Sequence, residues 1–305
     1  MSGKGADIIV LDGGLGTHLA ARGNDVTGQL LSAQILREKP AEIVAAHADF
    51  FDAGAQVATT CSYQVSADGL AAAGGNASEA EGLLRRSVDL ARDAAQAAEE
   101  RTGASGLQVA ASLGPYGAGP GAGDEYDGAY GRSVQELREW HRPRIEVLAS
   151  TAADFLLAET VPSMREVEAI ALELQEIEMP AMLSVTVEHG QLRGGGSLKE
   201  CAQIAAECRN IVAIGVNCCS TLEALAGIRL LAAETDIPLS AYPNSGETWD
   251  AQARSWKSRG EGSASLLESV NAFADAGVSF LGGCCRVTPR EIAAISQQLR
   301  GNCLR

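Results

Sequence analysis

Two pairs of adjacent cysteines are the residues of this sequence best suited to chemistry. Cys218 and Cys219 follow the apolar run IVAIGVN, and Cys284 and Cys285 follow the run VSFLGG. Adjacent cysteines do not easily form a disulfide with each other, because a bridge needs a specific Cβ separation and dihedral angle. Both members of a pair can still bind one metal ion if the backbone turns sharply, and the two glycines before Cys284 would allow this approach. One more thiol from the other pair would complete a three-thiolate set with an open fourth position, as in catalytic zinc sites.

The alternative is that these cysteines only fill the core. Cysteine is among the most often buried residue types, and the sequence has none of the CxxC spacing of structural zinc sites. Spacing alone therefore leaves metal binding and core packing open. Cys201, Cys208 and Cys303 fall on predicted helices or the C-terminal tail, and we expect them to be structural.

Composition narrows the class of protein. The 305 residues are 46% hydrophobic and 21% charged, enough for a large core. A formal net charge of −15 without a basic stripe argues against nucleic-acid binding. No segment approaches the about 18 apolar residues of a membrane span, and the first apolar run is short for a signal peptide. We therefore expect a cytoplasmic protein with reduced thiols, and no feature specifies an oligomeric state.

The elements that must position these residues follow an alternating pattern. Short apolar runs, nearly continuous as in parallel strands buried on both faces, alternate with helical patterns at 40–54, 78–100, 133–150 and 288–300. This pattern predicts a single-domain (β/α)8 TIM-type barrel spanning residues 1–305. The predicted strands are 8–12, 55–61, 107–114, 153–160, 181–187, 211–218, 237–242 and 278–285.

The carboxyl ends of barrel strands carry the active site. The sixth and eighth predicted strands end in the cysteine pairs, and these strands can face each other across the barrel mouth; the second ends in Cys61. The Gly-rich segment 114–131 holds three tyrosines and is predicted to be either a lid or binding loop or a plain surface insertion. The run DGGLGTHL does not match a dinucleotide-binding GxGxxG, and the four histidines are too scattered to suggest a hydrolase triad.

Ordered motifs along the chain resemble the homocysteine S-methyltransferase family. They are LDGGLGTHL, HADFFDAGA, TTCSYQ, SLGPYG, HRPRIEVL, AETVPS, GVNCC, YPNSGE and GGCCRVTP. The resemblance covers nearly the whole chain. It departs at residues 192–198, LRGGGSL, where relatives often carry Ser-Asp-Gly, and in an extra Gly-Pro-Gly run within segment 114–131.

The resemblance implies a zinc ion and a set of site residues. Cys219 would pack rather than bind the metal. Asn217 would support its neighbour Cys218, and the other substrate-binding residues would hold the amino-acid end of homocysteine. The implied zinc ligands, which are also the catalytic residues, are Cys218, Cys284 and Cys285, and the implied substrate-binding residues are Asp12, Gly13, Gly14, Glu159 and Asn217.

The implied reaction moves a methyl group from a sulfonium donor, S-methylmethionine or S-adenosylmethionine, to the thiol of homocysteine and forms methionine. Betaine-using relatives have a C-terminal extension, and cobalamin-folate relatives have further domains, that these 305 residues do not show. Betaine as donor and selenocysteine as acceptor are the alternatives within the family. The alternative from another class is a non-catalytic barrel with a structural zinc ion.

Overall fold

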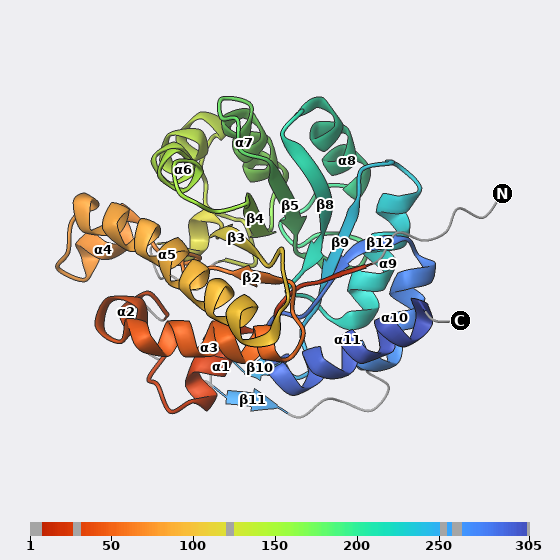
Figure 1. The fold of residues 1–305 in the computed structure, drawn as a ribbon. Coiled ribbons are helices and arrows are strands. Elements are labelled where there is room, and N and C mark those ends of the chain that lie inside the picture. The colour runs from red at the N-terminus through yellow and green to blue at the C-terminus, as the bar shows by residue number, and fades with distance from the viewer. Residues whose placement is uncertain (1–7, 27–31, 120–124, 251–254, 258–263, 304–305) are drawn as a thin grey trace.

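Eight parallel strands form a ring with helices on its outside (Figure 1). The computed structural model describes residues 8–26, 32–119, 125–250, 255–257 and 264–303. The strands are β1 (Ile9–Val10), β2 (Val57–Thr59), β3 (Gln108–Leu113), β4 (Phe155–Val161), β5 (Ala181–Val185), β8 (Ile211–Asn217), β9 (Leu239–Tyr242) and β12 (Val278–Leu281).

The ring closes between its first two strands. The sheet order is β1-β12-β9-β8-β5-β4-β3-β2, so β1 and β2 stand at its two ends. A parallel bridge between Leu11 and Val57 joins these ends, and the backbone N–H of Gln56 donates to the Val10 carbonyl at 2.7 Å. The predicted single-domain (β/α)8 barrel is confirmed.

One helix or more follows each strand and packs on the outside of the ring. The main helices are α3 (Pro40–Asp52), α5 (Ala77–Thr102), α6 (Val134–Ala149), α7 (Met164–Leu174), α8 (Leu198–Glu207), α9 (Thr221–Ala232), α10 (Leu266–Asp275) and α11 (Pro289–Cys303). Local sequence sets their ends: Ser133 caps α6 through the Glu136 N–H, and Gly103 ends α5 in the left-handed conformation with φ 72°. The four predicted helices correspond to α3, α5, α6 and α11.

Smaller elements lie between the strands and the main helices. They are α1 (Leu15–Ala21), α2 (Ser32–Glu38), α4 (Ala67–Ala72), the 3₁₀ turn η1 (Tyr116–Ala118), the hairpin of β6 (Val187–Glu188) with β7 (Gln191–Leu192), and the hairpin of β10 (Thr248–Asp250) with β11 (Ser255–Lys257). Their sequences lack a long hydrophobic period, so the alternating pattern did not reveal them.

Six of the predicted strands end one to four residues earlier than expected, and two of these differences, in the fifth and the eighth strand, bear on the site. The fifth leaves the barrel after Val185, because Val187 pairs with Leu192 in the β6–β7 hairpin. The eighth ends at Leu281, so Cys284 and Cys285 lie in the turn that follows the strand. This turn is closed by a hydrogen bond from the Val287 N–H to the Cys284 carbonyl at 3.1 Å.

The core has two layers. A small inner cluster fills the barrel, and a much larger outer cluster lies between the strands and the helices. The inner cluster contains Leu11, Val57, Ala110, Phe155, Leu157, Met182, Ala213 and Tyr242. Because side chains fill the barrel interior, the chemistry is left to the rim.

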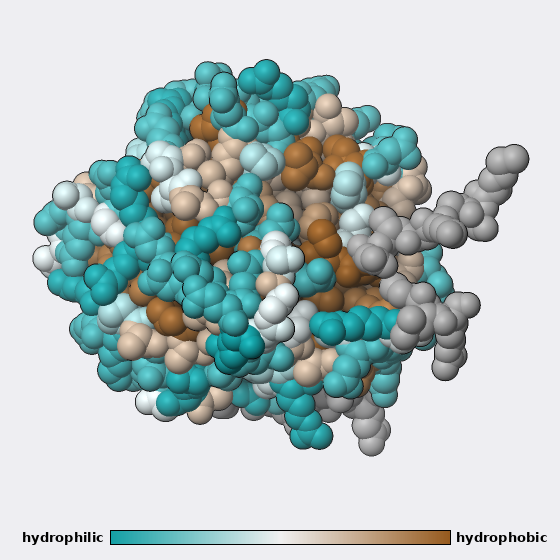
Figure 2. Space-filling view, in the orientation of Figure 1, coloured by the Kyte–Doolittle hydropathy of each residue, from teal (hydrophilic) through white to brown (hydrophobic). Residues whose placement is uncertain are grey.

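Hydrophilic residues cover most of the face shown in Figure 2, and hydrophobic residues gather in small groups between them. None of the helices within the described ranges has the length and apolar character needed to cross a lipid bilayer.

Candidate metal centre and substrate site

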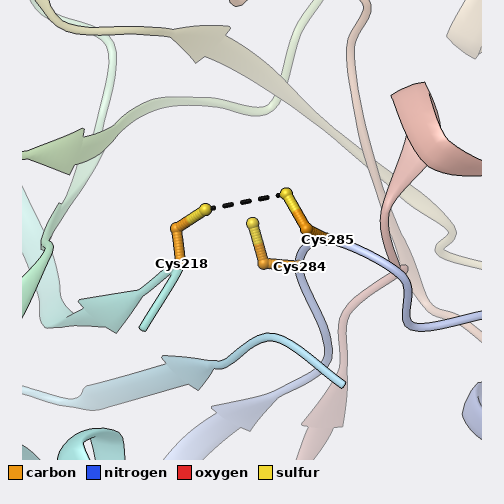
Figure 3. A group of neighbouring side chains, drawn as sticks. All are labelled: Cys218, Cys284 and Cys285. Atoms are coloured by element: carbon orange, nitrogen blue, oxygen red, sulfur yellow. Dashed lines mark hydrogen bonds between the residues drawn. The ribbon is translucent and has the colours of Figure 1, made fainter. Parts of the chain in front are cut away.

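Three cysteine sulfurs meet at the carboxyl rim of the barrel. The Sγ atoms of Cys218, Cys284 and Cys285 all lie within 4.8 Å of one another. The Sγ atoms of Cys218 and Cys285 are 3.8 Å apart, and the three side chains point toward a common centre (Figure 3). Among the described residues, no other group of Cys, His and acidic side chains is close enough to share one ion.

Neighbouring strands hold the three thiols in place. Cys218 directly follows β8, and its N–H donates to the Tyr242 carbonyl of β9 at 3.3 Å. The Cys284 N–H donates to the Pro243 carbonyl at 2.8 Å. Cys218 has φ 53°, a left-handed conformation that is uncommon for a residue with a Cβ. The backbone therefore leaves the direction of β8 at Cys218, where the thiol meets those from the β12 turn.

Asn244 ties the two cysteine-bearing segments together. Its Oδ1 accepts a hydrogen bond from the Cys285 N–H at 3.1 Å, and its own N–H donates to the Cys219 carbonyl at 2.9 Å. In the sequence, Asn244 follows the seventh predicted strand and belongs to the motif YPNSGE, and the sequence alone gave it no role. The structure makes it the connector between the two cysteine pairs.

The double glycine before the cysteines serves close packing. A Cβ on Gly282 would stand 2.5 Å from the Leu11 Cβ, and one on Gly283 would stand 2.3 Å from the Val287 Cβ. Neither glycine has a positive φ; the left-handed residue of this turn is Arg286, with φ 67°. The glycines thus let β12 and its turn approach β1 closely, whereas the sharp turn itself falls after the cysteines.

The remaining thiols lie apart from the three-sulfur group. Cys61 directs its Sγ at the Ser32 carbonyl at 3.5 Å. Cys219 packs into the outer core, where burial raises the pKa of its thiol to about 12. Cys201 and Cys208 are buried at the two ends of α8, and the side chain of Cys303 lies outside the described residues.

Glu159 is a buried carboxyl near the C-terminal end of strand β4. It is 7% exposed, and the Ser112 hydroxyl donates to its Oε1 at 2.5 Å. Burial, together with the negative charges of Cys218 and Asp12, raises the pKa of Glu159 to about 8, and the Ser112 hydrogen bond only partly opposes this. None of the described residues forms an ion pair with it, so the fold leaves its charge for a ligand to balance.

Asn217 fixes the backbone next to Glu159. Its Oδ1 accepts from the Thr160 N–H and its Nδ2 donates to the Thr160 hydroxyl, both at 2.8 Å. Thr160 has φ 60°, a conformation that needs such support. Asn217 thus links the end of β8, next to Cys218, to the end of β4, next to Glu159, and its expected supporting role stays a prediction.

Asp12 joins the first two strands. Its two carboxylate oxygens accept from the Thr59 N–H at 2.7 Å and the Thr59 hydroxyl at 2.8 Å. Burial raises the pKa of Asp12 to about 7, although the hydrogen bonds from Thr59 oppose the shift. A contact of Asp12 with substrate stays a prediction.

Gly13 and Gly14 pack against the turn that carries the cysteines. A Cβ on Gly14 would stand 2.6 Å from the Cys284 carbonyl oxygen. The Gly14 N–H donates to the Val287 carbonyl at 3.0 Å, so this amide is engaged within the protein. The two glycines lie beside the three-sulfur group, and their expected contact with a substrate carboxylate stays a prediction.

The tyrosine-rich segment adds residues that sequence reasoning missed. Residues 120–124 of segment 114–131 lie outside the described residues. Beyond them, the Tyr126 hydroxyl stands 3.3 Å from the Cys218 Sγ, and Glu125 accepts a hydrogen bond from the Tyr63 hydroxyl at 3.1 Å. One wall of the site therefore comes from loops, and the concentration of tyrosines was the available signal.

The three sulfurs fit a tetrahedral zinc ion. Two thiolates bound at about 2.3 Å to such an ion stand about 3.8 Å apart, which matches the separation of the Cys218 and Cys285 Sγ atoms, 3.8 Å. Three soft donors leave a fourth position for another ligand. A (β/α)8 barrel with these thiols and a buried acid at its carboxyl rim has the design of a barrel enzyme with a metal-binding centre.

Comparison with known proteins agrees with this class. A family model described as Homocysteine S-methyltransferase matches residues 9–299. Homocysteine S-methyltransferase of Escherichia coli (strain K12) is 40% identical over 292 residues, covering 95% of this chain and 94% of the relative. Selenocysteine Se-methyltransferase of Brassica oleracea var. italica is 37% identical over 306 residues, covering 95% of this chain and 88% of the relative.

A solved structure gives the same result. The metallated form of the homocysteine methyltransferase MmuM from Escherichia coli has a TM-score of 0.86 and 36% identity to this chain, and the match covers 96% of each. The chain belongs to the homocysteine S-methyltransferase family, whose members are methyl-transferring enzymes.

Proposed function

We propose that this chain is a zinc-dependent, cytoplasmic enzyme that transfers a methyl group from a small sulfonium donor to the thiol of homocysteine and forms methionine. Residues 1–305 would act as one homocysteine-binding barrel domain. The observation that carries the proposal is the gathering of three thiols within 4.8 Å at the rim, beside the buried Glu159. Family membership supplies the acceptor and the type of reaction.

Cys218, Cys284 and Cys285 would hold the zinc ion through their sulfurs. When bound, the ion supplies a site at which the acceptor sulfur is held as a thiolate at neutral pH, where a free thiol is mostly protonated. Asn244 and the packed glycines keep the two cysteine-bearing segments at the required separation.

Glu159 would hold the ammonium group of homocysteine. An ammonium beside this carboxyl favours its charged form, so binding is expected to lower the pKa of Glu159 from about 8 and to form a charge-assisted hydrogen bond. Asn217 would keep the backbone that carries Glu159 in place, whereas Asp12, Gly13 and Gly14 would form the wall next to the amino-acid end.

The transfer itself is one displacement. The acceptor sulfur forms a bond to the methyl carbon while the bond from that carbon to the donor sulfur breaks, and its electron pair stays on the donor sulfur. A positively charged sulfonium becomes a neutral thioether, so charge is neutralised and a site that excludes water favours the step. The loops with Tyr63 and Tyr126 would exclude that water.

Selenocysteine is a second candidate acceptor. The relative from Brassica oleracea var. italica named Selenocysteine Se-methyltransferase covers 95% of this chain. A selenolate is a soft anion like a thiolate, so the same three-sulfur centre would accept it.

The test is an assay of zinc-loaded protein with homocysteine and each donor in turn. We expect methionine from S-methylmethionine or S-adenosylmethionine, and none from betaine. Selenocysteine replaces homocysteine in a parallel series. If zinc-loaded protein transfers methyl to neither acceptor from any donor, the proposal fails and the barrel is a non-catalytic protein with a structural metal.

A further inference from the structure

The loop wall of the site carries a carboxyl, Glu125, for which the described residues provide no ion pair. Glu125 lies on the loop after η1, next to Tyr126, whose hydroxyl is 3.3 Å from the Cys218 Sγ. Burial and the negative charge of Cys218 raise the pKa of Glu125 to about 7. The Tyr63 hydroxyl donates to its Oε2, but none of the residues in the described ranges forms an ion pair with it.

Elsewhere the fold neutralises a buried carboxylate. Glu173 has a side chain 2% exposed, and Arg138 and Arg142 bind both of its oxygens at 2.7–3.1 Å. These arginines hold the pKa of Glu173 below its usual value in spite of the burial. Glu125 differs from Glu173 in two ways: none of the described residues forms an ion pair with it, and its side chain is only half-buried, so a ligand cation can reach it at the rim.

The acceptor brings an ammonium group and the donor a sulfonium group. Both oxygens of Asp12 are engaged by Thr59, which leaves Glu159 and Glu125 as the carboxyls available to these cations. Glu159 lies on strand β4 within the barrel rim, where the proposed function assigns it the ammonium of the acceptor. In an in-line displacement the acceptor sulfur, the methyl carbon and the donor sulfur lie on one line, so the donor stands on the far side of the acceptor sulfur. Because Glu125 belongs to the loop wall and not to the strand ends, it is available to the donor.

We infer that Glu125, held by Tyr63, binds the positive charge of the methyl donor and thereby selects sulfonium compounds over neutral thioethers. The inference rests on the proposed function and extends it to the donor side of the same site. The Tyr63 ring adds aromatic surface, which favours a sulfonium as it favours other organic cations, whereas the Tyr126 ring already has the Arg193 guanidinium 5.2 Å from its centroid.

A buried arginine keeps this carboxyl in position. The Arg144 guanidinium on α6 donates to the Tyr63 carbonyl at 3.0 Å and to the Gly114 carbonyl at 2.9 Å. Arg144 thus joins the loop after β2 to the loop after β3. The loop after β2 carries Tyr63, whose hydroxyl binds Glu125. Arg144 is a positioning residue for the donor wall.

The experiment measures binding of S-methylmethionine and of homocysteine separately, by calorimetry on zinc-loaded protein. Glu125→Gln removes the charge and keeps the shape, so the Kd for S-methylmethionine should rise about tenfold to hundredfold while that for homocysteine stays unchanged. Methionine, the neutral thioether, should bind wild type and variant alike. Asp127→Asn is the matched control, because Asp127 is exposed on the same loop and should change neither Kd.

Each other result overturns the inference. If Glu125→Gln leaves the Kd for S-methylmethionine unchanged, or weakens homocysteine as much as the donor, Glu125 does not recognise the donor charge. Should this variant not fold, as judged by its thermal melt, Tyr63→Phe takes its place. A twofold to fivefold higher Kd for S-methylmethionine supports the inference, and an unchanged Kd overturns it. The proposed function fails separately, if the wild type transfers no methyl group.

Discussion

The strand-end half of the site and its loop half are built by different means. Cys218 and Glu159 stand where barrel strands end, and hydrogen bonds between neighbouring strands fix their positions. Tyr63, Glu125 and Tyr126 stand on loops, which a single buried arginine joins. The first half binds the metal and the acceptor in our account, and the second faces the donor. In our proposal, the barrel fixes the chemistry and the loops set the choice of donor.

The largest expected effect is in the strand-end half. Cys284→Ala should abolish zinc binding and lower methyl transfer at least about a thousandfold, while the fold keeps its stability within about 1 kcal/mol. Metal analysis, the transfer assay and a thermal melt measure the three. Cys219→Ala is the control, because Cys219 packs into the outer core and should keep both zinc and activity. Full activity of Cys284→Ala would contradict the role of this half.

Glu159→Gln should separate acceptor binding from donor binding. We expect the KM for homocysteine to rise about tenfold to hundredfold, and that for the donor to change much less. Equal increases in both values would remove the division between the two halves.

The same variant should change the pH dependence of stability. The pKa of Glu159 is raised by burial to about 8 from an ordinary 4.5, so the carboxyl binds a proton more strongly in the folded chain. Its contribution to stability is therefore present below pH 4.5 and is lost as the pH rises toward 8. In urea unfolding of zinc-free protein, the free energy of unfolding of Glu159→Gln, taken relative to that of wild type, should increase by on the order of 3 kcal/mol from pH 5 to pH 8. If the free energies of unfolding of the variant and wild type differ by the same amount at pH 5 and at pH 8, the burial of the Glu159 charge is contradicted.

A smaller effect is expected from Arg144, the buried arginine that joins the two loops of the loop half. Arg144→Lys loses the planar fork that binds two carbonyls at once, so the KM for the donor should rise about tenfold and the free energy of unfolding should fall by about 2 kcal/mol. Arg142→Lys, on the same helix but paired with Glu173 away from the site, should leave the KM values unchanged. If Arg144→Lys raises the homocysteine KM more than the donor KM, the two halves are not separate.

The smallest effect concerns the contact between the halves. Tyr126→Phe removes the hydroxyl that stands 3.3 Å from the Cys218 Sγ, and we expect kcat to fall about twofold to fivefold at unchanged zinc content. Steady-state kinetics and metal analysis measure this. Loss of zinc from Tyr126→Phe would mean that the loop helps to build the metal centre.

The two halves also differ in how far the sequence predicts them. The apolar runs that predicted eight strands also placed Cys218, Cys284 and Glu159 near strand ends, because a buried strand is visible in the residue types. The exact ends were less visible, since the eighth strand stops at Leu281, three residues before Cys284. The family motifs then distinguished Cys218 from Cys219, which the spacing of the pair could not do.

The loop half was not predictable in the same way. Glu125 and Tyr126 lie in a segment without a hydrophobic period, and their contacts are with residues 62 and 92 positions away in the sequence. The packing role of Gly282 likewise depends on Leu11, at the other end of the chain. Contacts of this kind become visible only when the ring of strands closes.

The central claim is that three cysteine thiolates hold a zinc ion with one position open to the acceptor sulfur. X-ray absorption at the zinc edge tests it directly, on zinc-loaded protein before and after addition of homocysteine. Our account predicts three sulfur ligands at about 2.3 Å in the free protein and four when homocysteine is present. A zinc ion with four protein ligands whose spectrum does not change with homocysteine would contradict it.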